Sequence, residues 1–261
     1  MDRQHTSQTT CLTLVVPAVR DAVRVQATVE ALVKEFQATD LSFEVIVVDD
    51  GSQERIADRL AGSHESVRTI RFEQNRGKGA ALRRAFAESR GRFVVFTDED
   101  LPYGLTGVQD CLRALQSGAD AVIGDRTLPE SRMSVHVPLP RRILSFFSHP
   151  IVKRLSGGVR DTQCGLKGFR GELARMLAPR LVVDRYATDV EILHAIAMNH
   201  LPVQRVPVVW VSNGPSRVKL FRDTVQTGWD ILRIAARGRC GLYTLPAGSN
   251  IADVSCKWKR T

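Results

Sequence analysis

Arg92-Phe93-Val94-Val95-Phe96, followed directly by Thr97-Asp98-Glu99-Asp100-Leu101-Pro102-Tyr103, is the stretch that decides the fold of this chain. The apolar run predicts a short buried strand. Side chains alternate along a strand, so Asp98 and Asp100 project to one side and Glu99 to the other. Ligands of open α/β sheets bind at the carboxyl ends of the strands, and a hard divalent cation relieves the repulsion between two carboxylates. We therefore expect a cation site here, while a solvated acidic turn is the alternative for an isolated Asp-x-Asp.

Short apolar runs alternate with amphipathic segments over the first 125 residues. The runs predict strands, and the segments between them, where apolar residues recur with helical spacing, predict helices. Strands that alternate with longer helices form βαβ units. We therefore expect an α/β fold of Rossmann-like type, with a mostly parallel sheet and helices on both faces. The expected strands lie at residues 11–16, 43–48, 67–72 and 92–96, and the expected helices at 25–36, 52–61 and 80–89.

The second half of the chain has a less regular pattern. Its segments are shorter and are interrupted by Pro, Ser and Arg, which favour loops. The expected helices lie at residues 105–117, 189–199 and 216–237, the expected strands at 119–124, 165–170 and 203–211, and a loop at 127–140.

The chain of 261 residues is basic, with a net charge of +9 and a pI of about 9.7. This charge favours anionic partners, and nucleotides, lipid phosphates, acidic membrane surfaces and nucleic acids all qualify. A nucleic-acid-binding domain is the weaker alternative, because no recognised binding motif appears. The polar N-terminus lacks the apolar core of a signal peptide, and no apolar run reaches about 18 residues. We expect a cytoplasmic protein that can contact the inner face of a membrane peripherally.

Two further polar loops follow expected strands. Asp49-Asp50-Gly51-Ser52 comes after the second strand, where carboxylates can accept hydrogen bonds from a ribose or a base. Helix capping by Asp50 or Ser52 is the alternative. Asn75-Arg76-Gly77-Lys78-Gly79 joins the third strand to a helix, and its glycines and free N–H groups suit the close approach of an anion. Three polar loops at successive strand ends predict one shared site for a nucleotide and a metal ion.

The order of these motifs resembles that of the inverting glycosyltransferases of family 2, which have a GT-A fold. The resemblance covers residues 12–219 and is closest to the branch that makes polyprenyl- or dolichyl-phosphate sugars. The first family motif, Pro17-Ala18-Val19-Arg20-Asp21, is degenerate, since Val19 and Arg20 stand where Tyr and Asn are usual. The other matching positions are residues 49–52, 75–79 and 161–167, with Asp98, Asp100, Gly124, Arg126, Asp189, Glu191, Ser216, Arg217 and Lys219.

The resemblance implies a role for each matching residue. The residues implied for binding the donor nucleotide are Pro17, Asp21, Asp49, Asp50, Lys78, Asp98 and Glu99. Those implied for holding Mg²⁺ or Mn²⁺ are Asp98 and Asp100. Those implied for binding phosphates are Arg126, Arg217 and Lys219, and those implied for catalysis are Arg126, Asp189 and Glu191.

The resemblance also implies a domain organisation. Residues 11–238 are expected to form a single GT-A domain, with a nucleotide-binding half at 11–125 and an acceptor half at 126–238. Residues 1–10 are then a flexible N-terminus and residues 239–261 a C-terminal tail.

The implied donor is a UDP-, GDP- or dTDP-linked sugar, whose diphosphate leaves as in-line attack inverts the anomeric carbon. The implied acceptor is a polyprenyl phosphate, which is already anionic near neutral pH because the second pKa of a phosphate monoester is about 6. A soluble hydroxyl acceptor is the alternative, and it needs a general base, for which Asp189 and Glu191 are candidates. Acidic residues in the first turn of a helix also simply favour the helix dipole. A sugar-phosphate nucleotidyltransferase is a remote alternative, because residues 17–20 contain no glycine.

Two basic segments, residues 143–155 and 216–237, are candidates for contact with an anionic membrane. Phe146, Phe147 and Trp229 would be their apolar anchors. Packing against the sheet with a solvated basic face is an equal alternative. A homo-oligomer is also compatible with the sequence.

Overall fold

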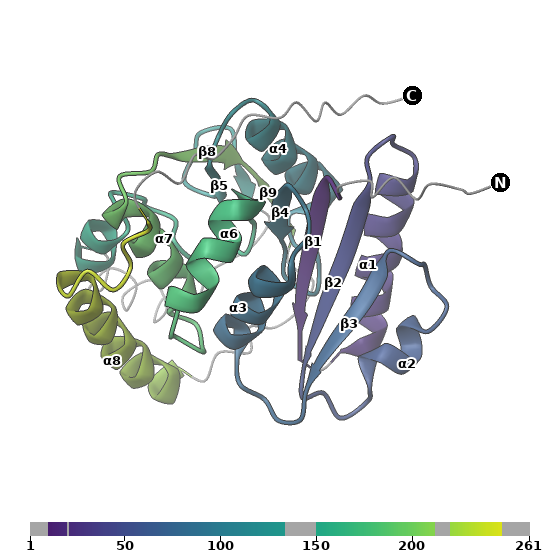
Figure 1. The fold of residues 1–261 in the computed structure, drawn as a ribbon, viewed down its shortest axis with the longest axis horizontal. Coiled ribbons are helices and arrows are strands. Elements are labelled where there is room, and N and C mark those ends of the chain that lie inside the picture. The colour runs from purple at the N-terminus through teal and green to yellow at the C-terminus, as the bar shows by residue number, and fades with distance from the viewer. Residues whose placement is uncertain (1–9, 20, 134–149, 212–219, 247–261) are drawn as a thin grey trace.

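The structure is a computed structural model that describes residues 10–19, 21–133, 150–211 and 220–246 (Figure 1). Its main sheet has seven strands in the order β3-β2-β1-β4-β7-β5-β8. All of them run parallel except β7, which is antiparallel to its neighbours β4 and β5. The strands of this sheet are β1 (Leu12–Ala18), β2 (Phe43–Asp50), β3 (Val67–Phe72), β4 (Phe93–Phe96), β5 (Ala121–Asp125), β7 (Lys167–Arg170) and β8 (Val203–Pro207).

Helices cover both faces of the sheet, and Figure 1 shows α1 and α2 on the side opposite α3 and α6. Alternation along β1 explains this, because Leu14 packs into the cluster formed with α1, α2 and α4, and Val15 into the cluster formed with α3, α6 and α7. The expected Rossmann-like α/β architecture is confirmed. The helices are α1 (Ala22–Gln37), α2 (Ile56–Leu60), α3 (Lys78–Glu88), α4 (Gly104–Gln116), α6 (Gly171–Leu177), η1 (Ala178–Arg180), α7 (Thr188–Met198) and α8 (Leu220–Arg239), and residues 150–155 form a further helical segment.

Two of the expected elements are shortened or divided in the structure, and α6 and the helical segment at residues 150–155 lie where no element was expected. The helix expected at residues 52–61 is only α2, because the buried Asp49 carboxylate accepts the N–H groups of Ser52 and Ile56 and holds the intervening residues outside the helix. The strand expected at residues 203–211 is divided in two. After β8 the backbone leaves the main sheet, and β9 (Val209–Trp210) pairs with β6 (Arg132–Met133), inside the segment expected to be a loop.

The first part of the expected C-terminal tail belongs to the folded core. Tyr243 is completely buried, and its backbone carbonyl accepts a hydrogen bond from Asn199 Nδ2 at 2.8 Å. The amide of Leu245 donates to the same side chain, at Asn199 Oδ1. The buried ring of Tyr243 and the two hydrogen bonds of the Asn199 side chain therefore hold this segment in place, although its sequence has little periodic pattern.

Among the described helices, none combines the length and the apolarity needed to cross a bilayer. Residues 1–9 and 247–261 of the two expected chain ends lie outside the described residues, as do the expected membrane anchors Phe146 and Phe147.

Candidate active site

Three predicted site residues meet beside the carboxyl end of β4. Asp98 follows this strand, Lys78 opens α3, and Asp189 lies in the first turn of α7. The ammonium nitrogen of Lys78 lies 2.8 Å from Asp98 Oδ1 and 3.6 Å from Asp189 Oδ2. Segments that are far apart in the chain thus place a cation between two carboxylates.

Lys167, at the start of β7, is a fourth charged residue that lies next to these three. Its ammonium nitrogen lies 2.5 Å from Asp189 Oδ1 and 2.6 Å from the carbonyl oxygen of Cys164. The ring of Phe96 lies beneath both ammonium groups, with centroid distances of 5.3 Å to Lys78 and 5.4 Å to Lys167. The charges therefore alternate in the order Asp98, Lys78, Asp189, Lys167, and we call these four residues the charge row.

The charge row keeps its central pair ionised. Burial by itself lowers the pKa of Lys78, but Asp189 and Asp98 outweigh that effect, so its pKa lies above the ordinary value. Burial by itself raises the pKa of Asp189, but Lys167 and Lys78 outweigh it and hold the pKa of this carboxyl below its ordinary range. Asp189 is therefore a firmly deprotonated carboxylate, and a weak base.

The expected metal ligands, Asp98 and Asp100, are both partly exposed, with side-chain exposures of 37% and 27%. Arg24 of α1 lies 3.9 Å from Asp100. A Cβ atom at Gly165 would lie 1.8 Å from Asp98 Oδ2, so only glycine leaves room for this carboxylate. Carboxylate oxygens that reach solvent suit Mg²⁺ or Mn²⁺. No group of three or more His, Cys, Asp and Glu converges within the described ranges, so water and a diphosphate would have to supply the other ligands.

Glu99 lies in the turn that follows β4, so the strand alternation expected for residues 98–100 does not extend to it. Its carboxylate accepts the amide of Val19 at 3.0 Å, and its carbonyl oxygen accepts the hydroxyl of Thr28. Asp21 caps α1 by accepting the amide of Arg24. Glu99 thus fixes the loop that follows β1 next to the acidic loop. Pro17 is the sixth residue of β1, two residues before Val19.

Asp49 and Asp50 both bind other parts of the protein. Asp49 is completely buried and pairs with Arg71, in addition to holding the start of α2. Asp50 accepts the amides of Arg76 at 2.6 Å and Gly77 at 2.8 Å. Neither Asp50 nor Ser52 is the N-cap of α2, which is Arg55. Asp49 instead holds the start of this helix, and Asp50 joins the two expected donor loops to each other.

The glycine loop differs from the expectation that its amides are free for an anion. The amides of Arg76 and Gly77 are taken by Asp50, and the amide of Gly79 donates to the carbonyl of Asp184 at 2.8 Å. A Cβ atom at Gly77 would lie 2.3 Å from that same carbonyl oxygen, and one at Gly79 would lie 2.1 Å from the carbonyl oxygen of Val183. The glycines are needed because the loop packs against the backbone before α7, and only the Lys78 side chain reaches the charge row.

Arg126, expected to bind phosphate, is held by the motif at residues 161–167. Its Nε and Nη2 atoms lie 2.8 Å and 2.6 Å from the two oxygens of Asp161, and its amide donates to the same carboxylate. The guanidinium also stacks on Trp210 at 4.9 Å from the ring centroid. A bidentate ion pair fixes the orientation of Arg126. A phosphate bound here would share this guanidinium with Asp161.

Glu191, which was predicted to be catalytic, does not belong to the charge row. Its side chain is completely buried and accepts the amides of Val182 and Val183, each at 2.9 Å. It also accepts the hydroxyl of Tyr243 at 2.7 Å. Two residues along α7 from Asp189, Glu191 points into the protein and ties α7 to residues on either side of it.

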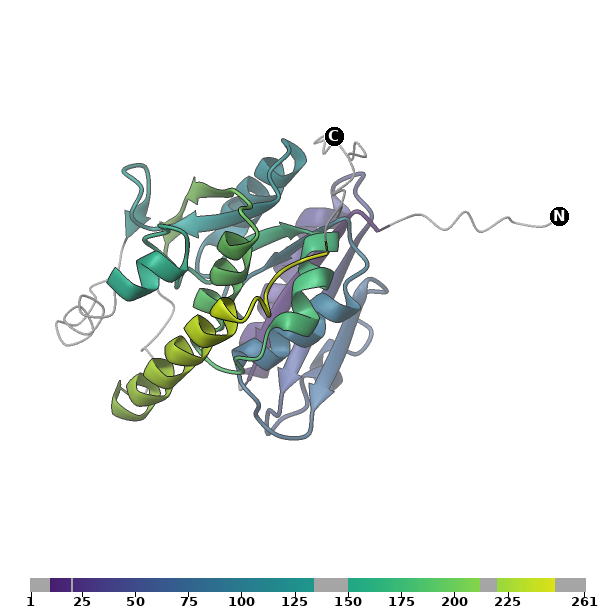
Figure 2. The ribbon, with the colours of Figure 1, turned by 60° about the vertical axis from the view of Figure 1, so that its left-hand side comes forward.

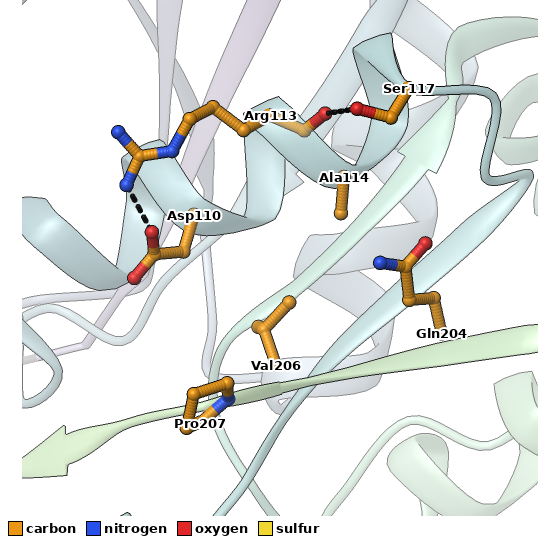
Figure 3. A pocket seen from close by; sticks show the side chains of 7 residues that line it. All are labelled: Asp110, Arg113, Ala114, Ser117, Gln204, Val206 and Pro207. Carbon is orange, nitrogen blue, oxygen red and sulfur yellow. Dashed lines mark hydrogen bonds and ion pairs between the residues drawn. The ribbon is translucent and has the colours of Figure 1, made fainter. Parts of the chain in front are cut away.

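The remaining predicted phosphate ligands, Arg217 and Lys219, lie outside the described residues. A surface cavity of about 330 Å³ lies elsewhere, between α4 and β8, and Figure 3 shows its lining. None of the predicted site residues lines it, and its two charged side chains, Asp110 and Arg113, pair with each other. We assign no function to this cavity.

Lys167 and Asp161 were not predicted individually as site residues, although both belong to the motif at residues 161–167. One signal was available. Lys167 stands directly before the apolar residues of a predicted strand, and a lysine at a buried position needs an acidic partner. Nothing in the sequence pattern indicates which acid that is.

Comparison with known proteins gives a consistent family. Residues 13–175 match the model of Glycosyl transferase family 2. Over 253 residues the chain is 31% identical to a dolichyl-phosphate beta-glucosyltransferase of Dictyostelium discoideum, a match that covers 90% of this chain and 76% of the relative. Over 260 residues it is 32% identical to the human protein of the same name, with 92% and 79% covered.

A solved structure shares the fold. Glucosyl-3-phosphoglycerate synthase from Mycobacterium tuberculosis, in complex with Mn²⁺, UDP-glucose and phosphoglyceric acid, superposes with a TM-score of 0.65 at 19% identity. The match covers 92% of this chain and 82% of that one. It confirms the expected GT-A type of α/β fold.

Proposed function

This chain belongs to glycosyltransferase family 2, and from that premise we propose that it transfers a sugar, with inversion, from a nucleotide-diphosphate donor to a polyprenyl phosphate. The relatives named dolichyl-phosphate beta-glucosyltransferase support glucose as the sugar and a dolichyl-type phosphate as the acceptor. The described residues make no contact that distinguishes UDP, GDP and dTDP as the nucleotide of the donor.

In this proposal Asp98 and Asp100 hold Mg²⁺ or Mn²⁺, since both offer partly exposed carboxylate oxygens. The bound ion would stabilise the charge that builds on the leaving diphosphate. Lys78, whose ammonium group touches Asp98, contributes a second positive charge at the same place. Arg126 is a further candidate for the phosphates, steered by Asp161.

The choice of acceptor rests on one observation: neither of the two described candidate bases, Asp189 and Glu191, is suited to accept a proton. Asp189 is paired with two lysines, and Glu191 is buried with its oxygens occupied. A hydroxyl acceptor must lose a proton to a base, and neither carboxylate is suited to take it. A phosphate monoester is already anionic at neutral pH and needs no base. The charge row therefore favours a lipid phosphate over the soluble hydroxyl acceptor.

This proposal predicts that label from a radioactive nucleotide sugar enters the organic phase only when a polyprenyl phosphate is present. The donor is chosen beforehand by thermal shift with UDP-, GDP- and dTDP-glucose in Mn²⁺ buffer, since a bound ligand stabilises the folded state. The matched control acceptor is the corresponding polyprenol, which keeps the lipid chain but offers a hydroxyl. Equal transfer to the polyprenol would refute the argument from the missing base.

We also propose that α8 contacts the membrane that holds such an acceptor. Figure 2 shows α8 on the outside of the molecule. Val225, Trp229 and Leu232 recur with helical spacing and are 52%, 69% and 62% exposed, so they form one apolar face. Arg233 and Arg239 are exposed on the same helix. An apolar face with basic residues beside it suits an anionic lipid surface.

The matching prediction is that the double variant Trp229→Ser/Leu232→Ser loses affinity for anionic vesicles by roughly tenfold or more, because two large apolar side chains no longer enter the lipid. Sedimentation with phosphatidylglycerol-containing vesicles measures this affinity. Val23→Ser is the control, since Val23 is 58% exposed on α1, which covers the opposite face of the sheet. An equal loss in the control, or no loss in the double variant, contradicts the assignment of α8.

A further inference from the structure

Lys167 is a buried charged residue to which the proposed function gives no role. It is completely buried, and its ammonium group contacts only the Asp189 carboxylate and the Cys164 carbonyl among the hydrogen-bond partners in the described chain. Burying an ammonium group is costly, and this one is compensated by one full negative charge and one carbonyl dipole. It lies too deep to touch a donor or an acceptor directly.

The partner of Lys167 is shared with Lys78. Asp189 offers Oδ1 to Lys167 at 2.5 Å and Oδ2 to Lys78 at 3.6 Å, and it is itself buried. Lys78 is closer to Asp98, at 2.8 Å, than to Asp189. Asp189 therefore pairs mainly with Lys167, and Lys78 lies closer to Asp98 than to Asp189.

Removing Lys167 would change that balance. Asp189 would remain a buried carboxylate with Lys78 as its single cationic partner, and an uncompensated buried charge is strongly unfavourable. The long, flexible side chain of Lys78 can move to a tighter pair with Asp189. That movement would withdraw its ammonium group from Asp98, where the charge of the leaving group is expected to build.

We propose that Lys167 is a positioning residue for the transfer reaction: by occupying Asp189 Oδ1 it keeps the ammonium group of Lys78 directed at Asp98 and at the donor diphosphate. This inference rests on the proposed function, because it assumes that a diphosphate leaves beside Asp98. It extends that function by giving the lysine of the 161–167 motif a specific task.

A purely structural role for Lys167 is the competing explanation, and a single variant, a double variant and a destabilised control together separate the two. Lys167→Met leaves Asp189 without its main partner and is expected to lower both stability and turnover. Lys167→Met/Asp189→Asn removes both charges of the buried pair together, so stability should largely return. The attraction of Asp189 for Lys78 disappears at the same time, so the ammonium group of Lys78 should return to Asp98 and turnover should recover with it. The control is Glu44→Gln/Arg68→Met, which removes a partly buried ion pair at the amino ends of β2 and β3, away from the site.

Two measurements decide the question, both made below the melting temperature of every variant. The first is kcat and KM for the nucleotide sugar. We expect kcat to be roughly 10- to 100-fold low in Lys167→Met, as for other residues that orient a catalytic group, with a smaller change in KM, and to recover largely in the double variant. The control should lose stability without this loss of kcat. Wild-type kcat in Lys167→Met would overturn the proposal, and so would a kcat that stays as low in the double variant as in Lys167→Met.

The second measurement is the rate at which Lys78 is modified by reductive methylation, followed by mass spectrometry of its peptide. Lys167→Met should slow this modification several-fold, because a tighter pair with Asp189 shields the amine. An unchanged rate would overturn the proposal. This readout needs no acceptor and no turnover, so it stays decisive even if polyprenyl phosphate proves not to be the acceptor.

Discussion

Asp98→Asn should lower kcat by on the order of 10²- to 10³-fold, the largest effect on turnover that we expect from a single substitution. The change keeps the shape of the side chain but removes a negative oxygen that both the divalent ion and Lys78 use. Binding of Mn²⁺, measured by electron paramagnetic resonance in the presence of the nucleotide, should weaken in parallel. Thermal stability should change little, because the side chain is partly exposed.

Two further variants sharpen this test. Gly165→Ala keeps every charge but places a methyl group 1.8 Å from Asp98 Oδ2, so it should displace the carboxylate and reproduce much of the loss. Asp110→Asn removes one acid from the surface cavity between α4 and β8 and should leave kcat unchanged. Full activity of Asp98→Asn in buffer stripped of divalent ions would refute the metal assignment.

Glu191→Leu should cost about 3 to 5 kcal/mol of unfolding free energy, the largest effect on stability that we expect. The substitution leaves two backbone amides and the hydroxyl of Tyr243 without their acceptor in a completely buried place. Chemical denaturation measures the loss, and the variant should also expose residues 240–246 to proteolysis, because Tyr243 is tied to this carboxylate.

Glu191→Gln distinguishes this structural role from catalysis. The amide oxygen can still accept the two backbone N–H groups, so we expect a small loss of stability and a kcat close to that of the wild type. If Glu191 were the general base, the same change would reduce kcat by roughly 10²- to 10⁴-fold. Such a reduction in a fully folded variant would restore the role that the sequence comparison implied and would reopen the case for a hydroxyl acceptor.

The two acids of α7 show how far sequence spacing reaches. Asp189 and Glu191 both lie in the first turn of this helix, and the sequence motif alone gives no reason to assign them different roles. Two positions along a helix correspond to a rotation of about 200°, so the side chains leave on nearly opposite sides. Asp189 pairs with Lys78 and Lys167. Glu191 accepts hydrogen bonds from Val182, Val183 and Tyr243. Only the packing around the helix decides which of them belongs to the site.

The sequence alone determined the order of strands and helices over the first 125 residues, the α/β class and the position of the acidic loop after β4. These features depend on local periodicity and on chain connectivity, which the residues encode directly. It did not determine that β7 enters the sheet antiparallel between β4 and β5, or that this strand brings Lys167 to Asp189. It also did not show that the glycines at 77 and 79 serve a contact with the protein's own backbone. These features are contacts between segments that are distant in the chain. Which residue pairs with a buried charge, or packs closely against a glycine, depends on the tertiary structure and cannot be read from local sequence.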